Sequence, residues 1–256
     1  MSLVERHHRG PVMTITLADE ERRNALSDEL LADLLSAIEE ANSSESTRVV
    51  VVTNRGSVFS AGANLRERSS HDAPVLRLSD LFLAIRHSEK IFVGRINGHC
   101  VAGGVGLAAV LDISLASQTA TFGFSEVRLG LAPAIISVVC LPKMRLAAAQ
   151  SAFLRGHRFS ASEAAELGLI TACAAPESLD AALEETISDL LAGEPHALAV
   201  TKELLRTVPT LSLEDAFTWT SEISKSLFAS ERAREGMNSF FEKRDAPWVA
   251  HLEESE

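Results

Sequence analysis

Two turns rich in glycine and alanine are the first features of the sequence that could do chemistry. They span residues 60–63 (Ser-Ala-Gly-Ala) and 102–104 (Ala-Gly-Gly). Such turns leave backbone N–H groups free and let a ligand approach the main chain closely. The second turn opens a predicted helix, whose dipole favours a developing negative charge. Two N–H groups converging on one oxygen would form an oxyanion hole, although the same glycines could serve only tight turns and helix packing.

A glutamate in a largely apolar stretch is the second candidate. Glu126 lies within residues 121–131, most of which are apolar. Partial burial would raise its pKa, which is the tuning that a general acid/base needs near neutral pH. The competing interpretation is a solvent-facing strand residue or an ion pair with Arg128.

Other patterns exclude whole classes of site. Residues 104–109 fit the G-x-G-x-x-A pattern of dinucleotide-binding proteins, but seven residues separate Ile96, the end of the preceding predicted strand, from Gly104. We therefore expect no such site. There is no G-x-S-x-G nucleophile motif. The three cysteines lack metal-ligand spacing, so we expect buried apolar thiols, no metal and no cofactor.

The elements that would position these residues alternate between strands and helices. We predict strands over residues 12–17, 49–53 and 91–96, and we predict that Ser27 caps a helix. The run 49–53 is typical of a strand buried on both faces. This order indicates α/β layering. Beyond about residue 143 the pattern predicts helices over residues 147–154, 160–168, 179–191 and 198–205 and between 213 and 243.

Composition and charge narrow the class of protein. The chain has 256 residues, 46% hydrophobic and 23% charged, which fits one domain with or without a small helical appendage. A formal net charge of −11 argues against a nucleic-acid partner. The apolar run 105–111 is far shorter than the about 20 residues of a membrane span. Because the N-terminus is charged where a signal peptide is apolar, we expect a cytoplasmic protein with no membrane contact.

Six segments in order resemble the crotonase (enoyl-CoA hydratase/isomerase) superfamily. They are residues 23–27 (RNALS), 59–65 (FSAGANL), 96–112, 122–133, 156–170 and 235–248. Each motif is modest evidence alone, whereas six at suitable separations cover nearly the whole chain. The resemblance implies an α/β fold, a crotonase-like spiral of ββα units with a helical C-terminal region. We expect residues 1–195 to form the spiral core and residues 196–256 to form a helical trimerisation region.

The resemblance also implies partners and roles. The ligand would be an acyl-CoA thioester, and the chain would assemble as a homotrimer or a dimer of trimers. The backbone N–H groups of Ala63 and Gly103 would hold the thioester oxygen and stabilise an enolate, with Glu126 as the acid/base. Arg22 or Arg23 and Arg66 are candidate phosphate contacts, which would let an acidic protein bind an anionic ligand. The residues expected to bind substrate are Arg23, Ala25, Ala61, Gly62, Asn64, Leu65, Gly104 and Pro133.

Two departures from the family pattern bear on the reaction. Hydratases of this family generally use two glutamates around one water, and Gly106 stands where the first would be. Asn64 replaces the usual Asp. We expect an enoyl-CoA hydratase-type lyase that relies on Glu126, with a Δ3–Δ2 enoyl-CoA isomerase as the alternative because it needs one carboxylate. Outside enzymes, the alternative is a non-catalytic acyl-CoA- or RNA-binding homologue.

Overall fold

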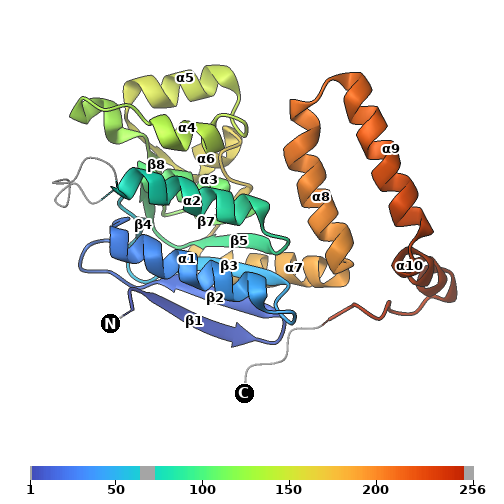
Figure 1. Cartoon of the computed structure of the whole chain (residues 1–256). Coiled ribbons are helices and arrows are strands. Elements are labelled where there is room, and N and C mark those ends of the chain that lie inside the picture. The colour runs from blue at the N-terminus through green and yellow to red at the C-terminus, as the bar shows by residue number, and fades with distance from the viewer. Residues whose placement is uncertain (1, 64–72, 251–256) are drawn as a thin grey trace.

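The computed structural model describes residues 2–63 and 73–250, which form two sheets, covering helices and a C-terminal group of helices (Figure 1). The strands are β1 (Val4–Arg9), β2 (Val12–Leu17), β3 (Val49–Asn54), β4 (Val58–Ser60), β5 (Ile91–Ile96), β6 (His99–Val101), β7 (Ile113–Ser117), β8 (Thr121–Gly123), β9 (Arg158–Ser160) and β10 (Ala172–Ala174). The α-helices are α1 (Asp28–Ser43), α2 (Ala73–His87), α3 (Gly103–Val110), α4 (Ala134–Cys140), α5 (Leu146–Arg155), α6 (Ala161–Glu166), α7 (Leu179–Ala192), α8 (Pro195–Thr207), α9 (Leu213–Ala229) and α10 (Glu231–Glu242). Three 3₁₀ helices complete the description: η1 (Ser125–Leu129), η2 (Pro176–Ser178) and η3 (Val208–Thr210).

The two sheets are built from a repeated unit. The larger sheet has the order β1-β2-β3-β5-β7-β10, and all its neighbouring pairs are parallel except β1 with β2. The smaller sheet has the order β4-β6-β8-β9, parallel except for β8 with β9. Strands β3, β5 and β7 each continue, after a short turn, into β4, β6 and β8. The carboxyl ends of β4, β6 and β8 therefore meet at one edge of the smaller sheet.

Strand β3 is buried on both faces, as its β-branched run predicted. All six of its residues are buried. Because successive side chains point to opposite faces, Val50 and Val52 pack into the main core with α1, α2 and α3, whereas Val49 and Val51 pack against α7. The strand predictions at residues 12–17 and 91–96 are confirmed as β2 and β5.

The predicted helix cap at Ser27 is also confirmed. The Ser27 hydroxyl accepts a hydrogen bond from the Leu30 N–H at 3.2 Å, and Asp28 and Glu29 lie in the first turn, where the helix dipole favours them. Strand β1 was not predicted, because its outward side chains read as an exposed terminus. Its only buried residue is Val4, and an edge strand with charged side chains is a common way to prevent edge pairing.

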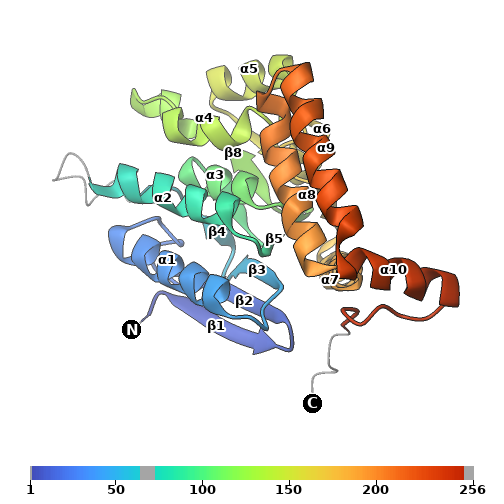
Figure 2. The ribbon, with the colours of Figure 1, turned by 45° about the vertical axis from the view of Figure 1, so that its right-hand side comes forward.

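The helices after α7 lie to one side of the two sheets, where α8 and α9 diverge from the turn that joins them (Figure 1), and α10 continues from the far end of α9 (Figure 2). Lys202 fixes α8 to the core, because its ammonium bonds the Ile85 and Lys90 carbonyl oxygens and the Asp112 carboxylate. Helix α9 buries none of its residues. The division at residue 195 stays a prediction. Within the described residues, no helix is both long and apolar enough to cross a membrane.

Candidate active site

The first glycine-containing turn follows β4 and is held by the segment before α1. The Ala61 N–H donates to the Arg23 carbonyl at 3.1 Å, and the Leu26 N–H donates to the Gly62 carbonyl at 2.8 Å. Gly62 has a φ of 82°, a left-handed conformation that a side chain disfavours. This turn therefore has a fixed path, and it directs the chain into Ala63.

The second turn follows β6 and leads directly into α3. Ala102 has a φ of 49° and a ψ of −118°, a backbone conformation that favours glycine, and its N–H donates to the Gly123 carbonyl at 2.9 Å. Gly103 is the first residue of the eight-residue helix α3. The N–H groups of a first helical turn have no partner within the helix, and the helix dipole makes this end electropositive.

The two turns lie against each other. A Cβ built on Gly62 would stand 3.0 Å from the Gly103 nitrogen, and one built on Gly103 would stand 3.7 Å from the Ala63 nitrogen. No acceptor for the N–H of Ala63 or Gly103 lies among residues 2–63 and 73–250. The structure thus brings the two predicted oxyanion donors together, and neither N–H group has a partner in the described part of the chain.

Glu126 follows the third strand of the smaller sheet, β8, as the two glycine-containing turns follow β4 and β6. It lies in η1, which follows β8. Strand β8 lies next to β6, the strand that precedes Gly103, so both residues follow the carboxyl ends of neighbouring strands. Its side chain is half-buried, and its Oε2 is a buried oxygen with no hydrogen-bond donor in the described part of the chain. Burial raises the pKa of Glu126 above its usual range, and a backbone hydrogen bond opposes that rise only in part. No ion pair with Arg128 forms between these two described residues.

The charge of Glu126 acts on Cys140, a residue of α4. Burial raises the pKa of the Cys140 thiol to about 12, and the negative charge of Glu126 adds to that rise. Cys140 is the last residue of α4 and has no exposed surface. A half-buried carboxylate, one oxygen of which has no donor in the described part of the chain, has the environment of an acid/base group rather than of a surface charge.

The surroundings of Gly106, one turn into α3, leave no space for a carboxylate side chain at that position. A Cβ built there would lie 2.5 Å from Ile136 Cγ2 and 2.8 Å from Phe82 Cζ. Both neighbours are buried, at 3% and 4% exposure. The volume beside Gly106 is therefore filled by apolar side chains of α2 and α4.

The other predicted binding residues fall into three groups. Ala25 and Ala61 flank the two hydrogen bonds that hold the first turn, and Gly104 packs on Ser60, whose carbonyl oxygen would lie 2.3 Å from a Cβ at that position. The Arg23 side chain is exposed, and Pro133 is buried directly before α4. Arg22 lies 3.8 Å from each of two carboxylates, Asp19 and Glu29. Asn64, Leu65 and Arg66 lie outside the described residues.

Sequence reasoning missed three residues at this site: Asn24, Phe82 and Ile136. Asn24 is wholly buried and left-handed, with a φ of 50°. Asparagine is enriched in that conformation, so its place between Arg23 and Ala25 carried a weak signal. The contacts of Phe82 and Ile136 with Gly106 join residues far apart in the chain, and no local pattern reports them.

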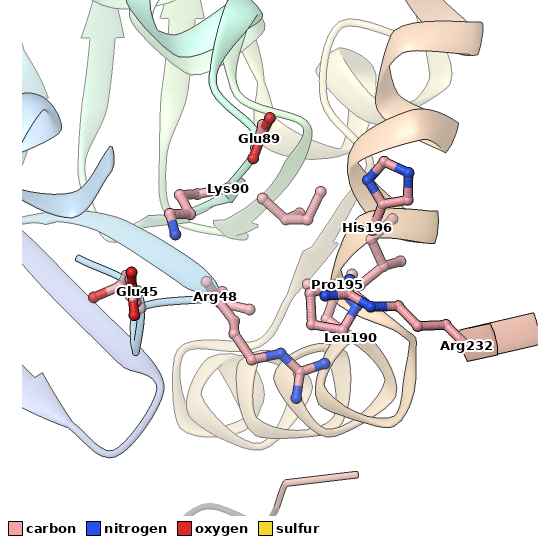
Figure 3. A pocket seen from close by; sticks show the side chains of 12 residues that line it. Glu45, Arg48, Glu89, Lys90, Leu190, Pro195, His196 and Arg232 are labelled. Carbon is pink, nitrogen blue, oxygen red and sulfur yellow. The ribbon is translucent and has the colours of Figure 1, made fainter. Parts of the chain in front are cut away.

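A cavity of about 350 Å³ lies elsewhere, at the amino ends of β3 and β5 (Figure 3). Its cations are already engaged: Arg48 donates to the Gly193 and Trp248 carbonyls, Lys90 to the Ser44 carbonyl, and Arg232 pairs with a carboxylate of α8's cap. The candidate donors follow the carboxyl ends of β4 and β6, so this cavity is a separate feature. Across residues 2–63 and 73–250, no group of three His, Cys, Asp or Glu side chains could hold a metal ion.

Known proteins resemble this chain in sequence and in fold. Residues 7–251 match the family model of enoyl-CoA hydratase/isomerase. A Thermus thermophilus protein provisionally named enoyl-CoA hydratase is 34% identical over 250 residues, covering 92% of this chain and 96% of the relative. A carnitinyl-CoA dehydratase of Salmonella arizonae is 29% identical over 256 residues, covering 94% and 96%. The crystal structure of an enoyl-CoA hydratase from Mycobacterium smegmatis matches with a TM-score of 0.92 at 29% identity, covering 98% of this chain and all of that one.

The chain therefore belongs to the enoyl-CoA hydratase/isomerase (crotonase) family. Its fold is the α/β crotonase fold, with two mixed sheets followed by C-terminal helices. The predicted family and fold class are confirmed. Membership implies acyl-CoA substrates.

Proposed function

We propose that this protein is an enoyl-CoA hydratase-type lyase that adds water to an α,β-unsaturated acyl-CoA. The observation that carries the proposal is the pair of adjacent backbone donors, Ala63 and Gly103, at the sheet edge where η1, which carries Glu126, also begins. Two fixed donors can stabilise the negative charge that develops on a thioester oxygen, and loss of one such donor typically costs on the order of 10²–10³ in rate.

One carboxylate suffices for the chemistry. Glu126 takes a proton from water while the water oxygen bonds to Cβ, and the Cα=Cβ electrons move onto the thioester oxygen. The Ala63 and Gly103 N–H groups hold the resulting enolate. The protonated Glu126 then gives its proton to Cα, so that one water is added in total. A raised pKa suits this cycle, because the group must both accept and return a proton.

The ligand enters as a substrate and no cofactor is required. Ala25, Ala61 and Gly62 offer main-chain contacts to the acyl-CoA thioester, together with Gly104 and Pro133. Arg23 is the arginine nearest the first turn whose side chain is exposed and has no ion pair among the described residues, which favours it as the phosphate contact. The cytoplasmic location stays a prediction.

The closed space at Gly106 favours a second candidate reaction, Δ3–Δ2 enoyl-CoA isomerisation. Ile136 and Phe82 leave no room there for a second carboxylate that would anchor a water molecule. In isomerisation, Glu126 would take a proton from C2 of a 3-enoyl-CoA and return it to C4, while the same two donors hold the dienolate. This reaction needs neither water nor a second carboxylate.

A homotrimer or a dimer of trimers is the proposed assembly. On α9, the side chains of Leu213, Phe217 and Phe228 are 68%, 66% and 72% exposed. Apolar surface of this kind on one helix is typical of a protein interface. Sedimentation of the wild type should give a trimer or hexamer mass, and Phe217→Glu should lower it; a monomeric wild type would rule the assembly out.

The two reactions separate in one pair of assays. Crotonyl-CoA loses its enoyl absorbance on hydration, whereas 3-hexenoyl-CoA gains that absorbance on isomerisation. Loss in the first assay that disappears in Glu126→Gln supports the hydratase. Activity in the second assay alone supports the isomerase. Binding of CoA thioesters with no turnover in either would overturn both in favour of a binding protein.

A further inference from the structure

The segment that precedes α1 contains an unusual turn. Arg23 and Asn24 are consecutive residues other than glycine with φ values of 56° and 50°. Left-handed conformations cost energy for such residues and persist only where surrounding contacts hold them. Asn24 has no exposed surface, so its contacts are all within the protein.

The Asn24 side chain connects three parts of the chain. Its Oδ1 accepts a hydrogen bond from the Asp19 N–H at 2.9 Å, which closes the turn. Its Nδ2 donates to the Val58 carbonyl at 2.8 Å and to the Arg55 carbonyl at 3.3 Å. Val58 is the first residue of β4, and Arg55 lies in the turn between β3 and β4. Asn24 therefore fixes the turn at residues 19–24 relative to β4. Strand β4 leads into residues 60–63, the first oxyanion loop, and residues 102–104 form the second oxyanion loop.

The residues beside Asn24 hold that loop itself. The Arg23 carbonyl accepts from the Ala61 N–H, and the Leu26 N–H donates to the Gly62 carbonyl. The Leu26 side chain also reaches the second loop, because its Cδ1 would lie 3.0 Å from a Cβ built on Gly103. The turn thus contacts both loops that carry the candidate donors, while the hydrogen bonds of the Asn24 side chain go to Asp19, Arg55 and Val58.

We infer that Asn24 is a positioning residue for the oxyanion hole. It holds the Ala63 N–H where this group and the Gly103 N–H can both donate hydrogen bonds to one oxygen atom. This inference rests on the proposed use of those two donors. It goes beyond that use, since it places the geometry of the donors under the control of a side chain that touches no substrate. A purely structural Asn24 would affect the stability of the fold and leave the polarisation of a bound thioester unchanged.

The test uses the ultraviolet spectrum of bound 2,4-hexadienoyl-CoA, whose conjugated thioester absorbs at longer wavelength when its carbonyl oxygen accepts strong hydrogen bonds. Every protein carries Glu126→Gln, so that the probe is not consumed. Asn24→Gly keeps the left-handed backbone accessible and removes only the side-chain bonds. Asn24→Asp keeps the acceptor for Asp19 and loses the donor to Val58.

The matched control is Thr47→Val. Thr47 is 2% exposed, its hydroxyl bonds Ser44 at 3.0 Å, and it lies just before the amino end of β3, away from both loops. It therefore tests the loss of a buried polar contact in general. Thermal melting of each variant confirms that it is folded at the temperature of the spectrum.

We expect a shift to longer wavelength with the parent protein and with Thr47→Val, and a shift smaller by roughly half or more in both Asn24 variants. With Glu126 restored, kcat should fall by on the order of tenfold to a hundredfold in Asn24→Gly, with KM much less affected. An equal shift in all proteins, or an equal reduction in Thr47→Val, would overturn the role of Asn24. A parent protein that causes no shift would instead overturn the oxyanion hole, and the proposed function with it.

Discussion

Gly106 and Ile136 lie so close that a single methyl group on the glycine would stand 2.5 Å from Ile136 Cγ2. Real carbon–carbon contacts are about 3.5–4.0 Å. The contact joins α3 to α4 three residues after Gly103, the first residue of α3. It leaves Glu126 as the carboxylate on which the proposed chemistry depends, and it makes the site sensitive to any side chain at position 106.

Substitution of Gly106 should therefore be costly. We expect Gly106→Ala to lower the free energy of unfolding by about 1–3 kcal/mol, because overpacking forces neighbouring groups to move. Urea denaturation measures this change. Ile136→Ala removes the Cγ2 methyl group that makes this contact, so Gly106→Ala should cost less in that background. A fully additive pair would mean that position 106 is not limited by Ile136.

Substitution of Ala102 by glycine should stabilise the protein. Its φ of 49° lies in a region that residues with a Cβ rarely adopt, at a cost of about 1–3 kcal/mol. We expect Ala102→Gly to raise the free energy of unfolding by about 1 kcal/mol, after the greater flexibility of glycine in the unfolded chain is offset. Ala108→Gly, in the middle of the same helix, should lower it. Lower stability for Ala102→Gly would contradict the strained conformation.

The buried carboxylate should make stability depend on pH in a defined direction. Because burial raises the pKa of Glu126 in the folded state, this group stabilises the fold below its ordinary value of 4.5, and that contribution is lost as pH rises through the raised value. Glu126→Gln should thus melt above the wild type at pH 7. The difference should vanish below pH 4.5. Glu45→Gln, at an exposed carboxylate, is the control for the loss of one negative charge.

Lys202 should be the strongest single link between α8 and the core. Its ammonium contacts the Asp112 carboxylate at 2.8 Å and lies 5.1 Å from the centre of the Phe92 ring. Lys202→Met removes one partner of a largely buried ion pair, so we expect a loss of about 3 kcal/mol in unfolding free energy. Asp112→Asn added to Lys202→Met should cost little more. Equal and additive losses would show that the two groups act independently.

The elements that were predictable from sequence are those whose causes are local. The β-branched run of β3, the Ser27 cap, and the Ser160–Glu163 capping box that begins α6 each depend on residues within a few positions. The pairing of β4, β6 and β8 is not local, yet it is what brings Ala63, Gly103 and Glu126 to one edge. The residue pattern suggested an oxyanion hole at the two turns and an acid/base role for Glu126, and the family resemblance then assigned the individual donors.

What escaped prediction depends on contacts between distant segments. Phe82 and Ile136 close the space at Gly106 from two different helices, so the sequence showed a missing glutamate without showing what replaces it. The Asn24 side chain donates a hydrogen bond to Val58 in β4, which is 34 residues away along the chain. Such contacts are set by the packing of the whole fold and leave no periodic signal.

Exchange of the C2 protons of saturated acyl-CoA esters with D₂O tests the central claim most directly. It requires only that Ala63 and Gly103 stabilise an enolate and that Glu126 move the proton, whichever of the two reactions the enzyme performs. We predict that the wild type exchanges C2 protons of butanoyl- or octanoyl-CoA, followed by proton NMR, and that Glu126→Gln slows exchange by on the order of 10²–10⁴. Binding of both esters by the wild type without exchange, or equal exchange by the mutant, would contradict enolate chemistry at this site.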